Sequence, residues 1–161
     1  MDSSGYTAQS MLADGMHPIV TSRVMPSLPQ RIWSESNWER IEAGGPRHGC
    51  GTRWNARCRD DVLYLYRSQT GYGIYEATFM PTSNGDRKIS RAVIESHAQR
   101  YTSPSVKYDC LVLELVISAV LLDEPVRELR SAMTRMMRAM SGVADMPSQV
   151  AEYSVLGISS S

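Results

Sequence analysis

The stretch "DVLYLYRSQTGYGIYEATFMP", residues 61–81, is typical of a β-hairpin. Two runs rich in β-branched and aromatic residues flank a glycine-containing segment at residues 69–73, and this arrangement favours two antiparallel strands joined by a turn. The sequence therefore predicts a sheet here, against which the other elements pack. The candidate core positions of the hairpin are Leu63, Leu65, Ile74 and Phe79.

The stretch "TRWNARC", residues 52–58, has the two-residue period of a half-buried strand. Every second side chain of a strand points to the same face of a sheet, so Trp54 and Cys58 are expected to face the core. The arginines between them then face solvent. Arginines around an aromatic ring also suit nucleic acid, since they hold phosphates while the ring stacks on a base. The candidate nucleic-acid residues of this stretch are Arg53, Trp54, Arg57 and Arg59.

Zinc binding is a third interpretation of the same region. His48, Cys50 and Cys58 follow the pattern H-x-C-x7-C, whereas structural zinc sites hold four ligands that usually come as two close pairs. A fourth ligand would have to come from His97 or Cys110, elsewhere in the chain. Because no C-x2-C pair is present, we expect no metal and no cofactor, and a zinc-binding module stays an alternative.

A short helix is expected at residues 34–45, before this region. Ser34 or Ser36 can cap its first turn, Trp38 and Ile41 share one face, and two glycines end it.

The segments after the hairpin are expected to mix helix and strand. Residues 87–101 place apolar side chains at helical spacing, which predicts a helix. Residues 106–122, rich in Val, Leu and Ile, are best explained as a central strand, with a helix as the rival for so long an apolar run. The tail, residues 148–161, is expected to form a last strand. This order predicts an α+β fold, in which a small antiparallel or mixed sheet carries helices mainly on one face.

The stretch "DEPVRELRSAMTRMMRAMSG", residues 123–142, predicts an amphipathic helix that Asp123 caps, with Pro125 in its first turn and Gly142 at its end. Its methionine-rich apolar side chains fall within one arc and its arginines on another side. Packing of the methionines on the sheet accounts for this pattern. The same helix can also offer its arginines to RNA phosphates or lipid headgroups, or its methionines to a partner protein. The arginines concerned are Arg127, Arg130, Arg135 and Arg138.

The domain organisation is simple. A chain of 161 residues is typical of one domain, and we expect it at residues 31–161. Residues 1–30 hold several prolines and small polar residues without periodicity, which predicts a flexible, extended N-terminal arm. The formal net charge is zero, so attraction to a polyanion would have to come from local patches.

Several classes of function are disfavoured. No G-x-S-x-G, P-loop or H-E-x-x-H motif is present, so we expect no enzyme and no small-molecule substrate. The N-terminus lacks the basic and apolar regions of a secretory signal. The longest apolar stretch, residues 110–122, is shorter than the roughly 20 residues that span a membrane. A protein that is not secreted and has no transmembrane segment is expected.

The last third of the chain combines a Tyr108-containing apolar segment, Pro125 and Arg127 at the start of an amphipathic helix, and a final segment that ends near Leu156 and Gly157. In this order these features resemble those of rhabdovirus matrix proteins of the plant-infecting type. The resemblance implies a location in the virion and the host cytoplasm, and an oligomer in which the arm inserts into a neighbouring copy. The candidate self-association residues are Met25, Pro26, Leu28 and Pro29.

These observations together predict a non-enzymatic viral structural protein of the matrix type. It is expected to self-associate and to bridge or condense ribonucleoprotein, with anionic membrane as a further surface. A small RNA-binding accessory protein, such as an RNA-silencing suppressor, is the alternative.

Overall fold

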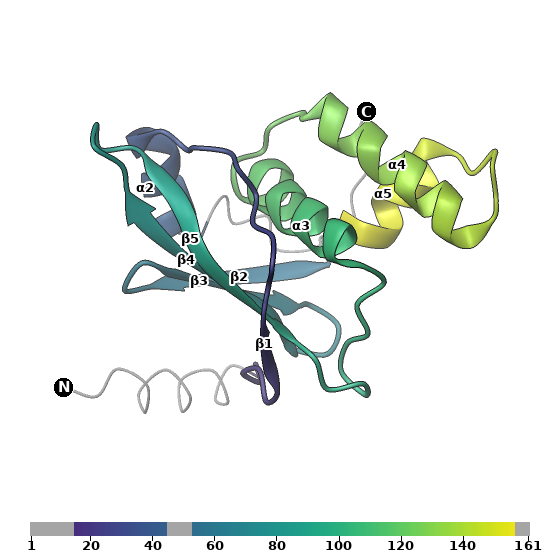
Figure 1. Cartoon of the computed structure of the whole chain (residues 1–161), viewed down its shortest axis with the longest axis horizontal. Coiled ribbons are helices and arrows are strands. Elements are labelled where there is room, and N and C mark those ends of the chain that lie inside the picture. The colour runs from purple at the N-terminus through teal and green to yellow at the C-terminus, as the bar shows by residue number, and fades with distance from the viewer. Residues whose placement is uncertain (1–14, 45–52, 157–161) are drawn as a thin grey trace.

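The computed structural model describes residues 15–44 and 53–156 (Figure 1). Its strands form one antiparallel sheet in the order β1-β5-β4-β3-β2. Helices gather mainly on one side of this sheet (Figure 1), as the α+β prediction requires. The strands are β1 (Ser22–Val24), β2 (Trp54–Arg59), β3 (Val62–Arg67), β4 (Gly73–Pro81) and β5 (Arg87–Glu95). The helices are α2 (Glu35–Glu42), α3 (Val106–Leu115), the π-helix η1 (Val116–Leu121), α4 (Arg127–Ser141) and α5 (Ser148–Leu156).

The predicted hairpin is formed by β3 and β4, and its four predicted core residues are all buried. The predicted strand β2 precedes it and pairs with β3. The turn between β2 and β3 consists of Asp60 and Asp61, whose φ angles are 51° and 67°. Two successive residues with positive φ are typical of the type I′ turn, whose twist matches that of the strands it joins.

Strand β5 replaces the helix that was predicted at residues 87–101. The prediction was wrong because a β-bulge imitates helical spacing. Phe79 pairs with Ile89, whereas Thr78 pairs with Arg91, so one extra residue interrupts the strand between them. A bulge shifts the alternation of side chains by one position. Ile89 and Ala92, three residues apart, are therefore both buried in the main core.

The helical pair α3 and η1 replaces the strand that was favoured at residues 106–122, so the rival interpretation of this apolar run was correct. Ser105 caps α3, because its side chain accepts a hydrogen bond from the Tyr108 backbone N–H at 3.1 Å. The run is apolar on nearly all sides because the sheet and α4 both cover it. None of the helices in residues 15–44 and 53–156 is long and apolar enough to cross a membrane.

The C-terminal part of the chain departs from prediction in two places. Helix α5 occupies residues that were predicted as a strand, and residues 157–161 lie outside the described part. Helix α4 ends at Gly142 as predicted, with φ 75°. Its start is different, because Val126 rather than Asp123 precedes the first helical residue and no side chain caps it.

The N-terminal segment packs against the sheet. Residues 1–14 lie outside the described part of the chain. Residues 15–30, which were predicted to belong to a flexible arm before a domain at residues 31–161, instead supply strand β1 and bury Met16 and Met25, so they are part of the domain. The His17 backbone N–H donates to the Gly71 carbonyl at 2.7 Å, and β1 pairs with β5. A Cβ atom on Gly73 would lie 3.2 Å from the His17 carbonyl oxygen, so glycine permits this close approach. Helix α2 follows, and Ser34 caps it as predicted, accepting from the Asn37 backbone N–H at 3.2 Å.

Candidate nucleic-acid interface

Strand pairing divides the side chains of the sheet between two faces. Residues directly opposite each other on antiparallel strands share a face. The inner face, which includes Ala56, Leu65 and Tyr75, packs against the helices. Side chains one position along each strand point the other way. The outer face carries the polar groups of β2 to β5, and at one place it also carries a small buried cluster of Met16 and Tyr66, against which Tyr64 packs.

The outer face carries two pairs of basic side chains. Arg57 and Arg59 lie on β2, and Lys88 and Arg91 lie on β5. Arg59 and Arg91 occupy the two ends of one row that crosses four strands. Three strand spacings of about 4.8 Å separate their Cα atoms by about 14 Å. Arg57, Lys88 and Arg91 are exposed and Arg59 is half-buried. We call these four residues the basic sheet face.

A tyrosine on β3 and a carboxyl group on β4 lie between the two basic pairs of the basic sheet face. Arg57, Tyr64 and Glu76 form a second row across β2, β3 and β4. Tyr64 is half-buried, and burial raises the pKa of its phenol, which therefore stays neutral. Burial also raises the pKa of Glu76, while nearby Arg91 acts in the opposite direction. The negative charge among these cations is thus easier to neutralise than that of an ordinary glutamate.

Trp54 is not on the basic sheet face, although it was a candidate for stacking on bases. It is 3% exposed, and its indole Nε1 donates to the Val155 carbonyl at 2.8 Å. Its ring centroid lies 5.7 Å from that of Tyr75, and the Arg67 guanidinium lies 4.4 Å from its centroid. The ring is part of the core, as the alternation of "TRWNARC" predicted. Arg53 precedes β2, and its backbone N–H donates to the Leu156 carbonyl at 2.8 Å.

The predicted arginine face of α4 is divided by the packing of this helix. Arg127 and Arg135 are exposed. Arg130 is only 8% exposed, and its Nε donates to the Pro125 carbonyl at 2.8 Å. Arg138 is half-buried, and its Nε donates to the Met146 carbonyl at 2.8 Å. The expectation of one solvent face with four arginines was wrong, because α3 and α5 both contact α4.

Most of the predicted self-association residues pack within this chain's own fold. Met25 is 5% exposed and belongs to the main core. Pro29 is buried and Leu28 packs against that core, whereas Pro26 is exposed. In this conformation, three of the four side chains contact their own chain rather than offering themselves to a neighbour.

The zinc interpretation gains no support from the described residues. His48 and Cys50 lie outside them. Cys58 faces the core, and burial raises the pKa of its thiol to about 12, which disfavours the thiolate that binds metal. Within residues 15–44 and 53–156, no three His, Cys, Asp or Glu side chains are placed to hold a metal ion.

A buried polar cluster joins β4, α3 and the segment between β5 and α3. The Tyr75 and Tyr101 hydroxyls donate to Asp109 Oδ1 at 2.8 and 2.5 Å, and the Ser103 hydroxyl donates to Oδ2. Asp109 is 2% exposed. Burial raises the pKa of both tyrosines, so their hydroxyls remain donors. These contacts satisfy the carboxylate within the fold, and the cluster is structural.

The sequence predicted half of the basic sheet face. The alternation of β2 indicated Arg57 and Arg59, whereas Lys88 and Arg91 were missed. Tyr64, which lies beside the face, was missed as well. The alternation of "VLYLYR", residues 62–67, is a signal that places Tyr64 outward. No comparable signal exists for β5, because its bulge interrupts the two-residue period.

Comparisons with known proteins give no relative: the chain matches no protein-family model, no curated protein and no solved structure.

Proposed function

We propose that this chain is a non-enzymatic RNA-binding protein that contacts RNA through the basic sheet face. The observation that carries the proposal is the position of two basic pairs, from β2 and β5, on either side of Tyr64 on the face away from the helices. Arginine and lysine groups bind phosphates, and an aromatic ring between them offers a surface on which a base can stack. A neutral chain binds a polyanion through such a local patch.

The wider role we propose is that of a matrix-type viral structural protein. It would self-associate, condense ribonucleoprotein in the virion and the host cytoplasm, and use anionic membrane as a further surface. An RNA-binding accessory protein is the second candidate, because the basic sheet face serves both roles. The discriminating measurement is light scattering with RNA. Large assemblies support the matrix-type role, and a defined small complex supports the accessory role.

The salt dependence of RNA binding tests the site. Four cations that each neutralise one phosphate of a single strand give a slope of about −3 in log affinity against log salt. The Lys88→Ala/Arg91→Ala variant should bind a fluorescein-labelled oligouridine at least about tenfold more weakly, with a slope smaller by about 1.4. Fluorescence anisotropy at several salt concentrations measures both quantities.

A matched control removes the same number of charges elsewhere. Arg127→Ala/Arg135→Ala alters two exposed residues of α4, and its binding should stay within about twofold of the wild-type protein. If the α4 variant loses affinity and the β5 variant does not, RNA binds to the helix and the basic sheet face is not the site. If neither variant differs from wild type, both sites are excluded.

A further inference from the structure

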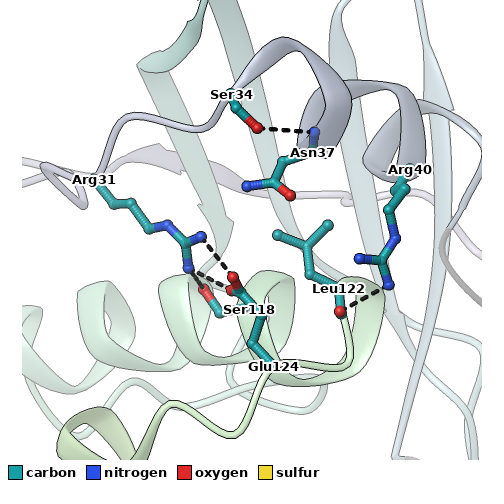
Figure 2. A network of polar contacts seen from close by, with 7 residues as sticks. All are labelled: Arg31, Ser34, Asn37, Arg40, Ser118, Leu122 and Glu124. Carbon is teal, nitrogen blue, oxygen red and sulfur yellow. Dashed lines mark hydrogen bonds and ion pairs between the residues drawn. The ribbon is translucent and has the colours of Figure 1, made fainter.

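A clamp of polar contacts joins the N-terminal segment to the connection between η1 and α4 (Figure 2). Arg31 donates from Nη1 and Nη2 to the Glu124 carboxylate at 2.6 and 2.9 Å. Its Nη1 also donates to Ser118 Oγ at 2.8 Å. Arg40 of α2 donates to the Leu122 carbonyl at 2.8 Å. We call the Arg31 contacts with Ser118 and Glu124 the Arg31 clamp.

The connection that the clamp holds is strained. Asp123 has φ 53° and Val126 has φ 38°, both in the left-handed region. A β-branched residue adopts this region only when its surroundings impose it. Pro125 lies between them, so the connection cannot become part of a regular helix without distortion. Residues 122–126 are thus a short connection that is strained at Val126, and the Arg31 clamp contacts it at Glu124. We call this connection the hinge.

The hinge leads into a hairpin of two helices, α4 and α5, which pack against each other and against the rest of the fold. Helix α4 packs on α3, and α5 packs on α4 (Figure 1). Met133 of α4 is fully buried in the main core. The far end of the hairpin is held at β2, where the Val155 and Leu156 carbonyls accept hydrogen bonds from the Trp54 indole and the Arg53 backbone N–H.

We propose that the α4–α5 hairpin exchanges between two copies of this chain, and that the Arg31 clamp restrains the exchange. A strained, short hinge favours domain swapping, because opening relieves the strain while every docking contact is remade with the second copy. The partner is therefore a second copy of this chain. Its α4–α5 hairpin carries the same side chains, so it fits the surface that this chain's own hairpin occupies. The proposal deepens the self-association of the proposed function and rests on it, and it places the interface at α4–α5 instead of residues 25–29.

Size-exclusion chromatography with light scattering tests the exchange after refolding at low and high protein concentration. Arg31→Ala should raise the dimer fraction about fivefold over wild type at equal concentration, since it removes a partly buried, bidentate ion pair. Arg31→Glu/Glu124→Arg restores the pair with reversed charges and should return the fraction toward wild type. A dimer fraction in Arg31→Ala equal to that of the reversed pair would overturn the proposal.

A second variant addresses the strain without touching the clamp. Val126 is the β-branched residue in the left-handed region, and glycine adopts a positive φ without steric penalty. Val126→Gly in the Arg31→Ala background should therefore lower the dimer fraction. An unchanged dimer fraction would remove strain as the driving force and overturn the proposal.

The kinetics separate an exchanged dimer from surface association. Dimer isolated from Arg31→Ala and then diluted should persist for hours, because the hairpin must undock before the copies part. Dissociation within the mixing time would refute exchange. Anisotropy with oligouridine on the same samples keeps the two proposals distinct. Loss of RNA binding in the Lys88→Ala/Arg91→Ala variant concerns the basic sheet face alone. A protein that is monomeric at every concentration but still binds oligouridine would overturn the exchange and leave RNA binding intact.

Discussion

Replacement of Asp109 by alanine should lower the free energy of unfolding by about 3–4 kcal/mol, the largest effect that we expect from a single polar residue. The Asp109 carboxylate accepts from three hydroxyl groups. Hydrogen bonds to a charged group are each worth about 1.5–3 kcal/mol. The loss is smaller than their sum, because Tyr101 and Ser103 are only half-buried and can turn to water. Tyr75, which is 1% exposed, cannot.

Urea unfolding followed by circular dichroism measures this change, with the slope of each transition as a check on two-state behaviour. Asp109→Asn keeps the shape and one acceptor oxygen, so about 1–2 kcal/mol should be lost. Tyr101→Phe removes one hydroxyl group, and about 1 kcal/mol should be lost. Equal destabilisation by Asp109→Ala and Tyr101→Phe would refute the reasoning, because the carboxylate would then hold no more than a single bond.

Three further predictions concern titratable groups. Burial pushes the pKa of Glu95 upward, but three backbone N–H groups that donate to its carboxylate hold it below the ordinary value. The stabilisation by Glu95 is complete above its unfolded pKa of about 4.3 and is lost as the pH falls through its lower folded pKa. The difference in the free energy of unfolding between the wild-type protein and Glu95→Gln should therefore disappear below about pH 4, as measured by urea unfolding. Glu76→Gln should strengthen oligouridine binding about threefold at neutral pH, since it removes one charge that repels phosphate. Fluorescence anisotropy should show that its affinity depends less on pH than that of the wild-type protein, whose Glu76 is neutralised as the pH falls. Cys58, whose pKa burial raises to about 12, should react with iodoacetamide at least about a hundredfold more slowly in the folded than in the urea-unfolded Cys50→Ser/Cys110→Ser protein; equal rates would contradict its burial.

The elements that the sequence predicted correctly are those whose signals are local. Ser34 caps α2 through an N–H three residues away, and Gly142 ends α4 with a positive φ. The β3–β4 hairpin brings together strands that are neighbours in the chain. In each case the residues that make the contact are close in sequence, so their pattern is visible without the fold.

The candidate site could be predicted only in part for the same reason. Alternation along β2 placed Arg57 and Arg59 outward, and this needed no knowledge of the neighbouring strands. Lys88 and Arg91 joined them only through the register of four strands and a bulge in β5. The clamp between Arg31 and Glu124 spans 93 residues and leaves no trace in the local pattern.

The sequence by itself determined the hairpin, the strand before it, the capped helix α2 and the class of the fold, because hydrophobic period, turn residues and caps act over a few positions. Only the tertiary structure decided the apolar run at residues 106–121, which became helical because it is covered on more than one side. It also decided which arginines of α4 reach solvent. Burial depends on what packs against each face, and the partners that do so lie far away in the chain.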